Sequence, residues 1–134
     1  MDDQELTVRR WLQRAEHDFA TAETMLAQPD APTDVVCFHC QQCVEKSLKA
    51  WLVKTNCDFP KTHDLQRLLS LCISIDDSFR ELQECAIALA DYAVETRYVE
   101  EWRDIAQQEA AVVAAGGARA GLAQLPLDPP HTGL

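Results

Sequence analysis

Apolar residues recur at three- and four-residue steps along most of this chain, which is the spacing of amphipathic helices. This pattern predicts helices over about 6–28, 33–55 and 101–115, with a short helix beginning near 64 and a fourth main helix beginning near 78. No segment convincingly alternates apolar and polar residues as a half-buried strand would. We therefore expect an all-α fold, an antiparallel bundle of four main helices plus one short helix.

Proline and glycine mark the ends of this pattern. Pro29 and Pro32 separate the first two helices, and Gly116 ends the last one. The residues that follow are rich in Gly and Pro and show little periodicity. We therefore expect one helical domain over 5–115 and a flexible tail over 116–134.

Short polar residues that can cap a helix N-terminus stand before the later helices. Their side chains can accept hydrogen bonds from the unpaired N–H groups of a first helical turn. The candidates are Thr33 or Asp34 for the second helix, Thr62 or Asp64 for the third, and Ser78 with Glu81 as a capping box for the fourth.

The composition narrows the class of protein. The chain has 134 residues, 47 % of them hydrophobic, which fits one domain with a real core. Its net charge of −10 argues against non-specific binding of long nucleic acids. Basic residues nevertheless outnumber acidic ones by five to two between Lys46 and Arg67, so a local anion site is compatible with the net negative charge of the chain.

The chain has no apolar run long enough to span a membrane, and its N-terminus does not resemble a signal peptide. We therefore expect a cytoplasmic protein with reduced thiols.

Three cysteines at regular spacing, Cys37, Cys40 and Cys43, flank His39 in the second helix and have the appearance of metal ligands. A zinc knuckle, however, needs a turn that brings two thiols to one ion and a second ligand pair elsewhere. On an uninterrupted helix the three thiols spread over about 120° of the surface. We therefore expect these cysteines to pack in the core as small apolar side chains and to hold no metal.

A polar stripe on the same helix is formed by His39, Gln42, Lys46 and Lys49. Two ammonium groups on one side of a helix suit a phosphate or an acidic partner. The alternative is a solvated face on which Glu45 pairs with Lys49 one helical turn away. The pattern alone leaves both interpretations open.

Two further segments offer candidate ligand contacts. His63 and Asp64 open the short third helix, where a helix N-terminus favours anions, although the same two residues can serve only as a cap. Arg97 lies between Tyr92 and Tyr98, and arginine beside aromatic rings can stack a base or clamp a phosphate. The alternative for Arg97 is a structural contact with exposed carbonyls at a helix end.

Four segments stand in this order along the chain: WLQRAEHDFATAETML, CFHCQQCVEKSLKAWLV, FPKTHDL and YAVETRY. Together they resemble the HEPN domain family of bacteria and archaea. The resemblance runs from about Val8 to the end of the last helix, and it departs at Val99, where the family usually has proline. It implies a helical bundle that pairs as a homodimer, small residues at the three cysteine positions, and binding of nucleotide or RNA in a groove formed on dimerisation. It also implies a cytosolic protein, often partnered with a small nucleotidyltransferase in toxin–antitoxin modules.

Some members of this family are metal-independent ribonucleases with a late signature of Arg, four to six residues, and His. His39, His63 and His131 have no Arg at that distance before them. Only Arg10 and His17 satisfy the count, and they lie on the first helix, where the family does not keep its motif. We therefore assign no catalytic residue and no cofactor, and expect a protein that binds rather than cleaves.

Three functions remain in competition. The first is a dimeric nucleotide- or RNA-binding module, possible companion of a nucleotidyltransferase. The second is a ribonuclease toxin with an atypical site. The third is a structural adaptor whose dimer surface includes Phe38 and the polar stripe. The ligand contacts predicted under the first are Lys46, Lys49, His63, Asp64, Arg97, Tyr98, Gln42 and His39.

Overall fold

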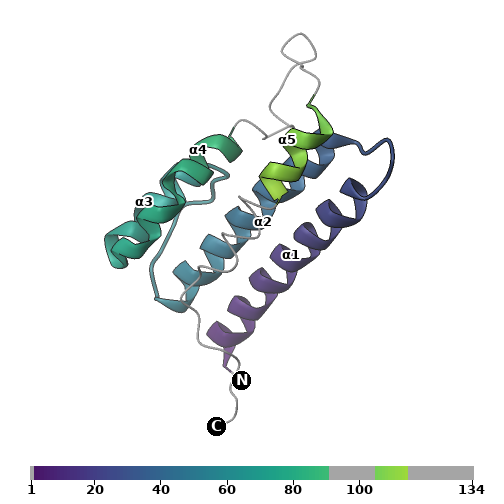
Figure 1. Ribbon diagram of the computed structural model, residues 1–134. Helices are drawn as coiled ribbons and strands as arrows, with labels where there is room; N and C mark the ends of the chain where they lie inside the picture. Colours follow the sequence, from purple (N-terminus) through teal and green to yellow (C-terminus); the bar gives the residue numbers. More distant parts are fainter. Residues whose placement is uncertain (1, 91–104, 115–134) are drawn as a thin grey trace.

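The fold, seen in a computed structural model that describes residues 2–90 and 105–114, is a bundle of helices (Figure 1). The described residues contain no strand, which confirms the all-α prediction. The predicted tail over 116–134 lies outside them. In chain order the elements are α1 (Asp3–Leu26), α2 (Thr33–Lys54), α3 (Leu65–Ile75), the 3₁₀ helix η1 (Asp77–Leu82), α4 (Gln83–Ala90) and α5 (Gln107–Val112).

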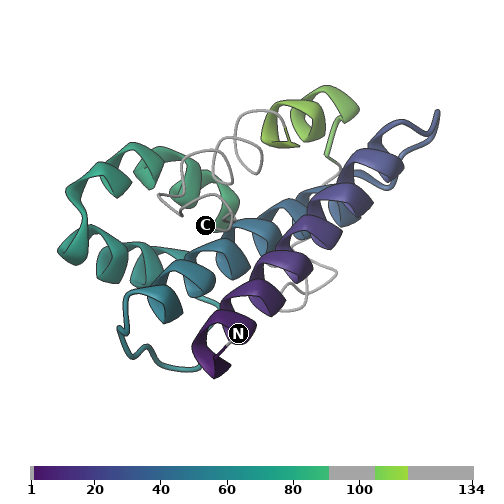
Figure 2. The same cartoon turned by 90° about the horizontal axis from the view of Figure 1, so that it is seen from below.

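Helix α2 is the centre of the bundle. The long helix α1 lies antiparallel along one side of it, and the α3–α4 pair lies on the other side (Figure 1). The view from below shows the same neighbours, with α5 beside the end of α2 that lies nearest the α1–α2 turn (Figure 2). The contact between α1 and α2 is the most extensive in the fold. Because helices cover α2 on several sides, polar as well as apolar side chains on α2 become buried.

Aspartate side chains cap the start of several described helices. Asp2 accepts a hydrogen bond from the N–H of Glu5 at 2.8 Å, so α1 begins at Asp3 rather than near residue 6. Asp64 accepts from the N–H of Gln66 at 3.0 Å, which confirms it as the cap of α3. A carboxylate at these positions also lies at the positive end of the helix dipole.

The predicted cap of α2 is wrong. The N-cap position is Pro32, whose side chain makes no capping bond. The hydroxyl of Thr33 instead donates to the backbone carbonyl of Ile105, at 2.5 Å. This hydrogen bond ties the start of α2 to the segment before α5, a long-range contact that local pattern could not reveal.

The predicted capping box of the fourth helix is also wrong. Asp76, not Ser78, occupies the cap position, and its carboxylate accepts from both the N–H and the hydroxyl of Ser78. The following residues wind as the tighter helix η1, and α4 begins only at Gln83. A short polar side chain that binds its own backbone two residues ahead favours such a turn over a regular helix start.

The last helix begins later than the pattern predicted. Within residues 105–114, Ala106 is an extended N-cap and α5 starts at Gln107 instead of near 101. Val112, in the last turn of α5, is 65 % exposed, whereas Ala110 is fully buried. None of the helices in the described part of the chain is both long and apolar enough to cross a membrane.

The cysteines of α2 lie in the core, as predicted. Cys37, Cys40 and Cys43 have no exposed surface, and neither does Cys72 of α3. Burial, supplemented by nearby thiols, raises the pKa of Cys40 and Cys43 from 9.0 to about 12, and the pKa of Cys72 to about 12 as well. The thiolate that a metal would require is therefore disfavoured at these positions.

The raised pKa values predict which thiols react. In the folded protein Cys40, Cys43 and Cys72 keep their protons until the pH nears 12, whereas unfolded thiols ionise near 9.0. The stability that these thiols contribute is therefore complete below pH 9 and is lost as the pH rises toward 12. With a thiol reagent at pH 8, we expect a fast phase from the half-buried Cys57 and a slower one from Cys85, which is also half-buried but whose pKa is raised by burial. All six cysteines should react only after denaturation. The variant Cys57→Ser should lose the fast phase, and rapid labelling of Cys40 in the native protein, mapped by mass spectrometry, would contradict the packing.

Candidate functional site

Three residues of the polar stripe of α2 contact α1: His39 and Lys46 bind Asp18, and Lys49 lies over Trp11. His39, Gln42, Lys46 and Lys49 do share one side of the helix, as predicted. That side is covered by α1, and Lys49 is only 6 % exposed. The interpretation of the stripe as a solvated face is therefore wrong, although the expected pair of Glu45 and Lys49 does form.

A first charged cluster surrounds Asp18 in the middle of α1. One carboxylate oxygen accepts from Nζ of Lys46 at 2.6 Å, and the other contacts Nδ1 of His39 at 2.7 Å. Asp18 is only 8 % exposed, so these two partners replace much of the water that an isolated carboxylate would hold. We call Asp18, His39 and Lys46 the Asp18 cluster. It fastens α1 to α2 at a fixed register.

A second charged cluster surrounds Glu45 on α2. Its carboxylate accepts from Nζ of Lys49 at 3.0 Å, and Nδ1 of His63 lies 3.0 and 3.2 Å from its two oxygens. Glu45 is 1 % exposed, and Nζ of Lys49 also lies 5.3 Å from the ring centroid of Trp11 on α1. We call Glu45, Lys49 and His63 the Glu45 cluster. It joins α2 both to α1 and to the loop before α3.

Two glutamines extend the Glu45 cluster. Nε2 of Gln42 donates to Oε1 of Gln41 at 2.7 Å and lies 3.5 Å from Glu45. Nε2 of the fully buried Gln41 in turn lies 3.5 Å from the backbone carbonyl of His63. The loop that carries His63 is therefore held at its backbone as well as at its side chain.

The two clusters share one chemical pattern. In each, a buried carboxylate is bound by one lysine and by Nδ1 of one histidine. The two carboxylates and the two ammonium groups cancel in charge, so neither lysine is left as an uncompensated cation. The accessible members are the histidines, since the side chain of His63 is 67 % exposed and that of His39 is 27 % exposed. A carboxylate can only accept, so Nδ1 of each ring carries a proton.

The structure gathers five of the eight predicted contact residues into this network: Lys46 and His39 at Asp18, and Lys49, His63 and Gln42 at Glu45. The sixth, Asp64, is exposed and uses one carboxylate oxygen to cap α3. Arg97 and Tyr98 lie outside the described residues. Their contact with ligand therefore stays a prediction.

Residues outside the predicted set organise the network. Asp18 was missed, although it interrupts the apolar stripe of α1 between Ala15 and Ala22, both fully buried. A charged residue at a core position of an amphipathic helix indicates a buried partner, and this signal was available in the sequence. Glu45 was considered only as the partner of Lys49, and its second contact, with His63, needs the loop to fold back.

Other candidates from the sequence lie apart from the clusters. Arg10 and His17 are exposed on α1. Phe38, proposed as an adaptor surface, is half-buried with its ring edge against His39, at 5.6 Å between centroids. Among the residues that the structure describes, no three His, Cys, Asp or Glu side chains form a group that could hold a metal ion.

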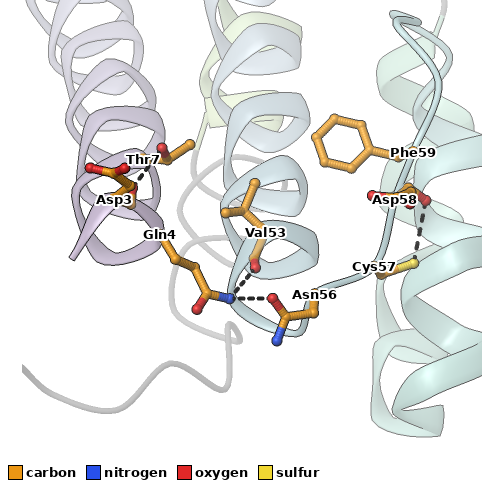
Figure 3. A pocket seen from close by; sticks show the side chains of 8 residues that line it. All are labelled: Asp3, Gln4, Thr7, Val53, Asn56, Cys57, Asp58 and Phe59. Carbon is orange, nitrogen blue, oxygen red and sulfur yellow. Dashed lines mark hydrogen bonds between the residues drawn. The ribbon is translucent and has the colours of Figure 1, made fainter.

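A cavity of about 390 Å³ lies where the end of α2 meets the start of α1 (Figure 3). Asn56, two residues after the end of α2, has a φ of 58°. Nε2 of Gln4 donates to Asn56 Oδ1 and to the carbonyl of Val53, each at 2.8 Å. These contacts satisfy the last carbonyls of α2, as a helix C-cap requires. None of the predicted ligand contacts lines the cavity, which we therefore regard as part of this junction.

A comparison with known protein families matches the HEPN domain over residues 8–117 of the 134-residue chain. No curated protein and no solved structure gives a significant match. The matched stretch contains both charged clusters and nearly the whole described bundle.

Proposed function

Since the chain belongs to the HEPN domain family, we propose that it is a binding module for nucleotides or RNA. In this proposal it works as a homodimer, with the ligand in a groove formed between the two copies. A small nucleotidyltransferase in a module of toxin–antitoxin type is the partner that the sequence resemblance implies. The family match supports the ligand class, and the Glu45 cluster supports the position of the site.

The observation that carries the proposal is the presentation of His63. Its ring is exposed while its Nδ1 is held by a carboxylate that is almost completely buried. A side chain fixed in this way loses little freedom when a ligand binds, which favours affinity. Side chains that bind ligands depend on supporting hydrogen bonds of this kind to keep their orientation.

Positive charge for a phosphate is available next to His63. Lys61 and Arg67 are exposed, and neither forms an ion pair within residues 2–90 and 105–114. The lysines of the two clusters are already paired, so in this proposal Lys46 and Lys49 hold the site together. Arg97 and Tyr98 complete it, by clamping a phosphate and stacking a base.

Isothermal titration calorimetry with ATP, GTP and a short single-stranded RNA tests this function. We expect binding to at least one of them, with one ligand per two chains because the groove forms between copies. The charge reversal Lys61→Glu should weaken binding several-fold, and the matched reversal Arg80→Glu, on η1 and paired with Asp77, should not. Absence of heat with all three ligands would remove the proposal, and one ligand per chain would remove the shared groove.

A ribonuclease with an atypical site is the second candidate, and one observation favours it. The contact between Glu45 and Nδ1 of His63 resembles the carboxylate–imidazole pair that orients a general base in hydrolytic enzymes. Such a ring can take a proton at Nε2 while the carboxylate stabilises the imidazolium that forms.

The test of this candidate is a cleavage assay with purified protein and a mixed-sequence RNA, in the presence of EDTA. The ribonuclease hypothesis predicts cleavage that disappears in His63→Ala and persists in His17→Ala, whose histidine is exposed on α1 outside both clusters. RNA that remains intact at high protein concentration would exclude it and leave binding as the function.

A further inference from the structure

The geometry at Glu45 points to the ligand atom that His63 contacts. We propose that Nε2 of His63 accepts a hydrogen bond from a ribose 2′-hydroxyl, so that the site distinguishes ribonucleotides from deoxyribonucleotides. This inference rests on the proposed nucleotide or RNA binding and specifies it further.

The argument begins with the proton on Nδ1. Both oxygens of Glu45 face this nitrogen, at 3.0 and 3.2 Å, and the same carboxylate accepts a hydrogen bond from the ammonium group of Lys49 at 3.0 Å. An ionised carboxylate has no proton to give, so Nδ1 must be the donor. In the neutral ring only one nitrogen carries a proton, and Nε2 is therefore a bare lone pair.

The free lone pair on Nε2 of His63 determines which ligand groups can bind there. It accepts from a hydroxyl or an amino group and repels the oxygens of a phosphate, which have no proton to offer. The ammonium of Lys49, which could have attracted a phosphate to this spot, is buried and already bound to Glu45. The ligand group that fits at His63 is therefore a donor, and phosphate belongs at the exposed cations nearby.

The ribose 2′-hydroxyl is the donor that matches the ligand class. It occurs at every position of RNA, and it is the group by which a protein can tell RNA from DNA. Donors on the bases vary from one base to the next, so they would impose a base preference in addition. The 2′-hydroxyl needs only one acceptor held in place.

The ring of His63 is held in the required orientation. Its Nδ1 contact fixes the side chain, and the amide of Gln41 lies 3.5 Å from its backbone carbonyl. Its 67 % exposed side chain leaves the far edge of the ring open to a ligand. His39 has the same Nδ1 contact but is only 27 % exposed, with the ring of Phe38 against it, so His63 is the better acceptor for a ligand.

The experiment compares RNA and DNA oligonucleotides of one sequence by fluorescence anisotropy at pH 8, where imidazole is ordinarily neutral. We expect the wild-type protein to bind RNA more tightly than DNA by roughly two- to tenfold, the value of one hydrogen bond. His63→Ala should bring the ratio of the RNA affinity to the DNA affinity close to one. His17→Ala, which removes an exposed histidine outside the clusters, should keep the ratio.

Each outcome has a distinct meaning. If neither oligonucleotide binds the wild type, the proposed function fails and this inference fails with it. If His63→Ala weakens RNA and DNA equally, His63 contacts phosphate and the inference alone is overturned. If the ratio survives in a His63→Ala protein whose melting temperature equals that of the wild type, another residue recognises the ribose and the inference is again overturned.

Discussion

Two carboxylates, Asp18 and Glu45, are buried in the bundle, and each must be neutralised there. A buried carboxylate without a cation costs several kcal/mol, because no water replaces the lost hydration. Lys46 and Lys49 supply that charge, and His39 and His63 complete the hydrogen bonding. No buried side-chain nitrogen or oxygen is left unpaired among the described residues. The Asp18 contacts also fix the antiparallel register of α1 on α2, since a shift by one turn would separate Asp18 from His39 and Lys46.

This constraint also decides which groups are accessible to a ligand. A lysine pair on one face of a helix suggests an anion site, but here both ammonium groups are bound to carboxylates and Lys49 is covered by α1. The same pairs orient both histidine rings, and the ring of His63 is exposed at the edge of the network whereas that of His39 is half-buried. In this member of the HEPN domain family the lysines thus stabilise the fold, and His63 is the group best placed for recognition.

The positions of the helices could be predicted from the sequence better than the contacts that each helix makes with its neighbours. Apolar periodicity located α1, α2 and α3 because each has one apolar stripe, and it placed the cysteines of α2 in the core. It also grouped the polar residues of α2 correctly. It could not show that α1 covers them, because a polar stripe looks the same whether it faces water or a complementary carboxylate such as Asp18. The starts of α2 and η1 differ from the prediction because the hydroxyl of Thr33 binds a distant carbonyl and Asp76 forms a local turn with Ser78.

The central claim is that Lys49 has a structural role as the charge partner of Glu45. A double-mutant cycle in urea denaturation tests it with Lys49→Met, Glu45→Gln and the double variant, and with Lys61→Met as an exposed control. We predict that Lys49→Met lowers the free energy of unfolding by about 3–5 kcal/mol, because it leaves a buried carboxylate unpaired. The double variant should recover much of this loss, and Lys61→Met should have no measurable effect. A Lys49→Met protein as stable as the wild type would contradict the account.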